Sequence, residues 1–67
     1  MSEDQEELKH KLEELKVEHR DLDIVIQKVS EQLPVDFIRL QRLKKRKLAL
    51  KDSISRIESM LLPDIIA

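Results

Sequence analysis

The chain has 67 residues, 40% of them charged, and a formal net charge of −1. A compact core of this length is marginal, so the chain forms at most one small domain. It contains no Cys, no Gly and a single aromatic residue, Phe37. That composition excludes disulfides, thiolate metal sites and glycine-rich phosphate loops, and its Leu- and Ile-rich apolar set is typical of long helices.

No targeting segment is visible. The first fifteen residues, MSEDQEELKHKLEEL, are acidic and periodic and contain no apolar run, which is unlike a signal peptide. No segment approaches the roughly 20 apolar residues of a membrane span. The absence of Cys suits a reducing compartment. We therefore expect a cytoplasmic protein with no membrane association.

A first helix is predicted over about residues 3–32. Ser2 followed by Gln5 has the spacing of a capping box, which marks a helix start. Apolar residues then alternate in steps of four and three, as in a helix packed along its length, and His19 fills the one polar position. The ladder is Leu8, Leu12, Leu15, His19, Leu22, Ile26, Val29 and Leu33. No glycine or internal proline interrupts it.

A second helix is predicted over about residues 35–62. Pro34 ends the first helix because its ring pushes the preceding residue away from helical angles. Asp36 can accept hydrogen bonds from the first amides of the new helix. The same alternation gives a second ladder of Leu40, Leu43, Lys47, Leu50, Ile54, Ile57 and Leu61. Pro63 ends this helix and begins a short apolar tail, 63–67.

The two ladders fit each other when the chain folds back at a tight turn, 33–34. Residues whose numbers sum to about 69 then face one another: Val29–Leu40, Ile26–Leu43, Leu15–Ile54, Leu12–Ile57 and Leu8–Leu61. In the middle, His19 faces Leu50. In the next layer Lys47 faces Leu22. The sequence therefore predicts an all-α, antiparallel, coiled-coil-like two-helix hairpin of one domain with a polar centre.

The polar centre comprises Glu18, His19 and Lys47. A cation at a seam position is costly unless it is paired or extends its amine to water. We interpret this layer chiefly as a device that fixes the register of the helices, with Lys47 near Glu18 and, more loosely, near Asp21 and Asp23. The alternative interpretation is a functional polar pocket.

Apolar residues outside the seam predict self-association. A lone hairpin of this size buries little apolar surface relative to the conformational entropy lost on folding. Two hairpins packed as a four-helix bundle would bury the extra apolar residues. These residues are Val17, Ile24, Val25, Phe37, Ile38 and Leu48, with Met60 and Leu62 further along. We expect a homo-oligomer, most simply a dimer.

Charge is unevenly distributed along the chain. Up to Leu33 there are ten acidic and five basic residues, and from Pro34 onward four acidic and eight basic ones. The basic face of the second helix comprises Arg39, Arg42, Lys44, Lys45, Arg46 and Lys51. Pairing with the acidic first helix accounts for it without a partner. The alternative is a nucleic-acid-associated accessory protein that binds phosphates, although a pI near 6.1 and the lack of stacking aromatics oppose it.

No pattern points to catalysis or to a bound cofactor. His10 and His19 are nine residues apart, so they do not share a helix face at ligand spacing. Two helices alone do not enclose a pocket of catalytic size. We expect no catalytic residue, no metal site and no cofactor.

Two sequence blocks occur together in this chain: VEHRDLDIVI at 17–26 and LQRLKKRKLALKDSI at 40–54. They resemble the YdcH-like family of small bacterial proteins of unknown function. The resemblance implies a bacterial cytosolic protein that folds as an antiparallel helical hairpin, and it supplies no catalytic residue, cofactor or partner. We expect a self-associating interaction or adaptor module, with an unidentified helical protein as a further partner.

Overall fold

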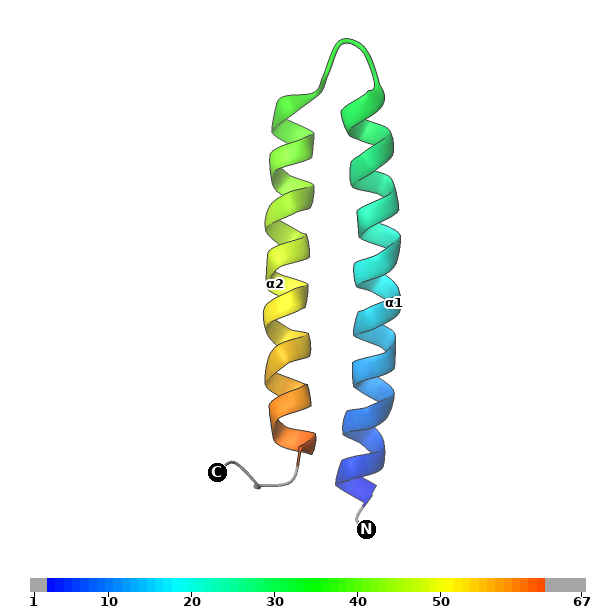
Figure 1. The fold of residues 1–67 in the computed structure, drawn as a ribbon, viewed down its shortest axis with the longest axis vertical. Helices are drawn as coiled ribbons and strands as arrows, with labels where there is room; N and C mark the ends of the chain where they lie inside the picture. Colours follow the sequence, from blue (N-terminus) through cyan, green and yellow to red (C-terminus); the bar gives the residue numbers. More distant parts are fainter. Residues whose placement is uncertain (1–2, 63–67) are drawn as a thin grey trace.

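The protein is a hairpin of two antiparallel helices, as predicted. In a computed structural model that describes residues 3–62, α1 (Glu3–Glu31) and α2 (Phe37–Leu61) lie side by side (Figure 1). These residues contain no strand, so the all-α fold is confirmed. We call the end with the connecting turn the loop end, and the end where α1 begins and α2 finishes the open end. Within the described residues, no helix combines the length and hydrophobicity needed to cross a bilayer.

Helix α1 begins at Glu3 and ends one residue before its predicted end. The proposed cap, Ser2, lies outside the described residues. At the other end the amide of Gln32 donates to the carbonyl of Val29 over 3.3 Å, which tightens the last turn. Lys28 lies in this last turn, where positive charge is favourable to the helix dipole.

Helix α2 begins at Phe37, two residues later than predicted. The side chain of Asp36 accepts the amide of Arg39 at 3.1 Å, and its carbonyl accepts the amide of Leu40 at 3.0 Å. Asp36 is therefore the N-cap of α2. In the connecting turn, the peptide bond between Leu33 and Pro34 is cis. The capping carboxylate satisfies an amide that has no partner within the helix, and this fixes the start after Asp36 instead of at the proline.

Removing this cap should destabilise the hairpin. Asp36→Ala is expected to lower the free energy of unfolding by about 0.5–2 kcal/mol, because the amide of Arg39 loses its acceptor. Urea denaturation followed by circular dichroism measures the change. Asp36→Asn, which keeps an acceptor oxygen, should lose much less. Equal losses in the two variants would mean that the negative charge at the helix start, and not the hydrogen bond, stabilises α2.

Helix α2 ends at Leu61, again one residue before its predicted end. Leu62 is extended, with φ −72° and ψ 139°, and its amide donates to the carbonyl of Glu58 at 3.0 Å. An extended conformation is what the residue before a proline prefers. Pro63 itself and the predicted tail, 63–67, lie outside the described residues.

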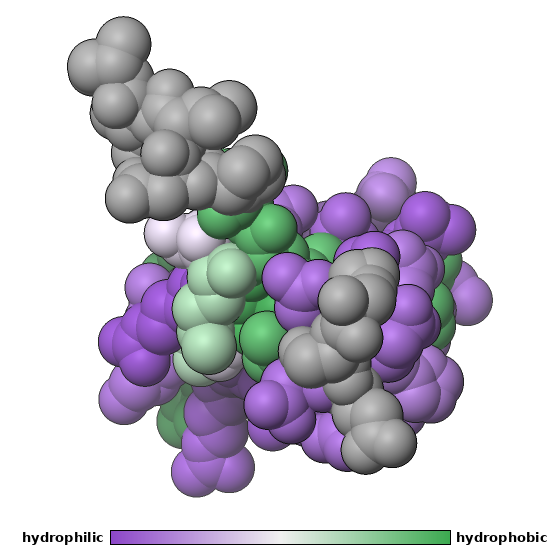
Figure 2. Space-filling model, turned by 90° about the horizontal axis from the view of Figure 1, so that it is seen from below, coloured by the Kyte–Doolittle hydropathy of each residue, from purple (hydrophilic) through white to green (hydrophobic). Residues whose placement is uncertain are grey.

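The seam between the helices is apolar but only partly covered. Three hydrophobic side chains are buried in it, Leu15, Val29 and Leu50, with 8%, 3% and 9% of their surface exposed. Most other ladder residues are half-buried: Leu8, Leu12, Leu22, Ile26, Leu40, Leu43, Ile54, Ile57 and Leu61. Leu33, predicted as the last residue of the first ladder, is instead 88% exposed, because α1 ends at Glu31 and Leu33 lies in the turn. Seen from the open end, hydrophobic residues gather between the helices and some also reach the outer surface, which is otherwise mostly hydrophilic (Figure 2).

Ion pairs across the seam agree with the predicted register. They join Glu18 to Arg46, Asp23 to Lys47, and Lys16 to Glu58. The residue numbers in these pairs add up to between 64 and 74, around the value of 69 that the apolar ladders give. Long side chains reach about one helical turn to either side, which accounts for the spread.

Candidate functional site

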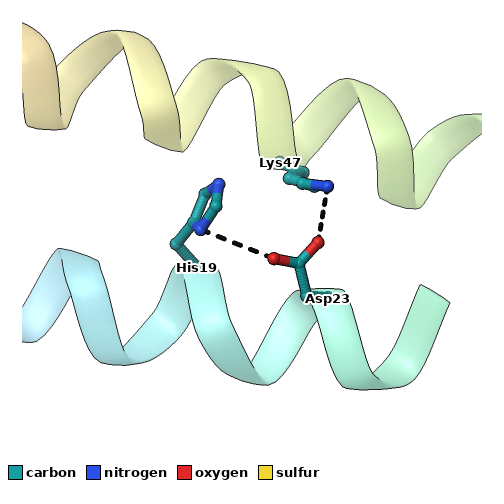
Figure 3. Close-up of polar contacts among 3 residues, drawn as sticks. All are labelled: His19, Asp23 and Lys47. Carbon is teal, nitrogen blue, oxygen red and sulfur yellow. Dashed lines mark ion pairs between the residues drawn. The ribbon is translucent and has the colours of Figure 1, made fainter. Parts of the chain in front are cut away.

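A polar cluster lies midway along the hairpin and consists of His19 and Asp23 on α1 and Lys47 on α2 (Figure 3). Lys47 Nζ lies 2.5 Å from Asp23 Oδ1, and His19 Nδ1 lies 3.8 Å from Asp23 Oδ2. The spacing of four residues places His19 and Asp23 on the same face of α1. One carboxylate thus lies between an imidazole on its own helix face and an ammonium group from across the seam.

Lys47 pairs with one of the carboxylates expected near it, although not with the one expected to be nearest. Glu18, expected beside Lys47, pairs with Arg46, while Lys47 pairs with Asp23. Glu18 and Asp23 are five residues apart, which turns them about 140° from each other around α1. An ion pair therefore flanks the seam on each side, and the polar layer extends beyond the three predicted residues.

Asp23 has a perturbed pKa. The hydrogen bond from the Lys47 ammonium is the main cause that lowers the pKa of this carboxyl from its ordinary value of 3.8. The positive charges of Lys47 and His19 act in the same direction, and desolvation opposes them. The folded state therefore favours the ionised carboxylate.

This lowered pKa predicts how stability changes with pH. A carboxyl with a lower pKa in the folded state contributes stability that is fully present above its ordinary pKa and is lost as the pH falls through the folded value. Asp23→Asn should therefore be less stable than the wild type at neutral pH. Their free energies of unfolding should converge below about pH 3.8. Urea denaturation from neutral pH to about pH 2 measures both curves, and a difference that stays constant over that range would contradict the assignment.

Within the described chain, one nitrogen of the His19 imidazole lacks a hydrogen-bond partner. Its Nε2 is buried and has no hydrogen-bond partner among residues 3–62, although a quarter of the side chain, 25%, remains exposed. A buried nitrogen without a partner costs stability. The polar contact that the structure gives His19 is with Asp23. The cluster is thus an ion pair with an attached imidazole.

The basic residues of α2 point in several directions. All six are exposed: Arg39, Arg42, Lys44, Lys45, Arg46 and Lys51. At about 100° per residue, Arg39, Arg42 and Arg46 follow one side of the helix. Lys44 and Lys51 are seven residues apart and follow another side. Since Arg46 also pairs with Glu18, the set does not form one continuous basic face.

Most of the predicted self-association residues are exposed in the single hairpin. The exposed fractions are 53% for Val17, 48% for Ile24, 72% for Phe37, 66% for Ile38, 67% for Leu48, 64% for Met60 and 68% for Leu62. Val25 is half-buried. These side chains are not used by the intramolecular seam, so they are free to contact another surface.

The surface depressions are shallow. One is lined by five residues of α1 alone, Glu6, Glu7, Lys9, His10 and Glu13. A second, at the open end, is lined by Leu12, Glu58, Leu61 and Leu62, and a third, at the start of α2, by Phe37, Leu40, Gln41 and Lys44. In the described part of the chain, no group of three or more metal-ligating side chains is placed to hold an ion.

Comparison with known proteins identifies one related family. Residues 12–58 match the family model described as "Protein of unknown function (DUF465)". The matched segment includes the polar cluster and both sequence blocks, 17–26 and 40–54. No curated protein and no solved structure matches the chain.

Proposed function

Since the chain belongs to the family described as "Protein of unknown function (DUF465)", which gives it no known activity, we propose from the hairpin itself that it is a self-associating, non-catalytic protein–protein interaction module. We also propose that the chain is a YdcH-like protein. The two blocks that resemble that family lie inside the matched segment, 12–58, which supports this proposal. A bacterial, cytoplasmic location follows from that resemblance and is proposed with it.

The observation that carries the proposal is the excess of exposed over buried apolar side chains. Eight large hydrophobic residues are exposed, whereas three hydrophobic side chains are buried among the described residues. Seven of the eight lie on or directly beside the helices, and Leu33 lies in the turn. Apolar side chains in such number on a small protein favour a contact surface. Two hairpins stacked on one broad side would bury those that share this side, Phe37, Leu48 and Leu62, in a four-helix bundle.

The hairpin is large enough to form a stable interface. A helix the length of α1, 29 residues, is about 44 Å long, and two helices side by side are about 20 Å across. One broad side therefore covers on the order of 800 Å², which is roughly what each partner contributes to a standard interface. A second copy is the proposed first partner, and another helical protein could use the same surface.

Nucleic-acid binding receives less support. A phosphate-binding surface needs several cations directed to one side. The six basic residues of α2 are distributed around the helix, and Arg46 is paired with Glu18. The basic run is therefore better explained as a solvated surface with pairs to α1.

Sedimentation equilibrium of the purified protein tests the proposal. At micromolar concentration we expect a particle of twice the chain mass of 7.9 kDa that dissociates on dilution. Because apolar burial drives the association, the dimer should persist in high salt, whereas a complex held by phosphate contacts would weaken. A folded monomer throughout the micromolar range would overturn the proposal.

A further inference from the structure

Three exposed apolar side chains lie along one side of α2 and its C-cap, one near each end and one in the middle. Phe37, Leu48 and Leu62 are 72%, 67% and 68% exposed. They are separated by 11 and 14 residues, which correspond to about three and four helical turns, so all three lie on the same side of the helix. We call these three residues the α2 stripe.

The α2 stripe belongs to a second ladder beside the seam. Positions along it alternate in steps of four and three: Phe37, Gln41, Lys44, Leu48, Lys51, Ser55, Glu58 and Leu62. The two ends and the middle of this ladder are apolar and its other five positions are polar, so a helix packed against it would contact both kinds of side chain. A surface depression lies at each end of this ladder. Phe37 lines the depression at the start of α2, and Leu62 lines the one at the open end. The stripe therefore has an apolar knob beside a hollow at each end.

Charge is polarised along the length of the hairpin. The loop half, residues 18–48, contains eight Lys and Arg against five Asp and Glu. The open half, residues 3–17 and 49–62, contains five Lys and Arg against eight Asp and Glu. The hairpin is thus positive toward the loop end and negative toward the open end by the same amount, three charges.

These two features select one arrangement of a second copy. If two hairpins packed parallel through the α2 stripe, Lys44, Lys51 and Glu58 would each lie beside the same residue of the other copy. The positive halves would also adjoin each other, and like charges a helix-packing distance apart repel. A parallel arrangement therefore places like charges side by side, both between single residues of the ladder and between the charged halves of the two hairpins.

An antiparallel arrangement removes these conflicts. Residues whose numbers add to 99 then face each other, so Phe37 meets Leu62 of the second copy. By the same rule Gln41 meets Glu58, and Lys44 meets Ser55. Leu48 likewise meets Lys51, whose aliphatic stem can cover the leucine while its amine extends to water. Each apolar knob faces the hollow at the opposite end of the other copy, and the positive half of one hairpin lies along the negative half of the other. Charge complementarity of this kind fixes orientation more than it adds affinity.

We therefore propose that two copies of this chain associate antiparallel through the α2 stripe, with the loop end of one beside the open end of the other. This inference rests on the proposed self-association and adds its surface and its orientation. Both can be tested in the intact protein.

Distance measurements between spin labels test the orientation. The chain has no Cys, so Gln32→Cys and Gln5→Cys each create a single labelling site. Both glutamines are exposed, Gln32 at the loop end and Gln5 at the open end. In the antiparallel dimer, labels on two Gln32→Cys chains are expected to lie about 40 Å or more apart, and likewise on two Gln5→Cys chains. An equimolar mixture of the two variants should add a distance below about 25 Å.

The outcomes separate the two proposals. A short distance in either singly labelled dimer, with none in the mixture, would overturn the antiparallel orientation while leaving self-association intact. Absence of any dipolar signal, together with a monomer mass by light scattering, would overturn the self-association on which the orientation rests. Long distances in the single variants and a new short distance in the mixture support both.

Discussion

Leu50→Ala should remove a large part of the protein's stability. The side chain is one of three buried hydrophobic residues in the described seam, with 9% of its surface exposed, and it lies near the middle of α2. Truncating a buried leucine costs roughly 2–5 kcal/mol, and we expect about 2–4 kcal/mol because the two-helix seam can partly collapse. For a small domain near the lower end of the usual stability range, this is a substantial part of the total. Urea denaturation followed by circular dichroism measures the loss.

Leu33→Ala is the matched control for Leu50→Ala. The substitution is chemically identical, but Leu33 is 88% exposed in the turn. Its removal should change the free energy of unfolding by less than about 0.5 kcal/mol. If the two variants lost similar stability, the seam assigned to Leu15, Val29 and Leu50 would not be the core of the protein.

Leu48→Glu should abolish most of the self-association without unfolding the hairpin. Leu48 is 67% exposed in the single chain and central in the α2 stripe. A dimer would lose two buried leucines, each worth about 1.5–3 kcal/mol, and a surface pair between each new carboxylate and Lys51 of the second copy would recover at most about 1 kcal/mol. The dissociation constant should therefore rise about 100-fold. Sedimentation velocity over a concentration series measures it.

Ala49→Glu is the control for this change. It introduces the same carboxylate one residue later, at an exposed position about 100° further around α2. The dissociation constant of Ala49→Glu should stay close to that of the wild type. Equal weakening by Ala49→Glu and Leu48→Glu would mean that added negative charge, and not loss of the apolar stripe, causes the effect. Circular dichroism of both variants verifies that the helices remain intact.

Much of the fold could be predicted from the sequence because one pattern determines it. Two apolar ladders of the same period, separated by Pro34, leave an antiparallel hairpin as the arrangement that buries both. The three buried residues, Leu15, Val29 and Leu50, are all ladder positions. The start of α2 was less predictable, because a proline and an aspartate two residues apart each favour a helix start. The hydrogen bond from Arg39 to Asp36 decides between them.

The candidate site could be predicted only in part. The position of Lys47 in the seam follows from its ladder, but the choice between Glu18 and Asp23 as its partner depends on which side of the seam the lysine reaches. That choice is set by side-chain packing, and the register alone allows both. The spacing of four residues from His19 to Asp23 was a usable signal for the cluster. The spread of the basic run around α2 also follows from helical geometry.

The distribution of buried residues along the seam has a consequence for local opening. Toward the open end, beyond Leu15 on α1 and Leu50 on α2, the seam residues of the described chain are half-buried. Separating the helix ends there disrupts few tightly packed side chains, so this region can fray while the loop end stays closed. Backbone amides of residues 5–12 should accordingly exchange with deuterium faster than those of residues 20–29. The two helices would then separate progressively, from the open end toward the loop end.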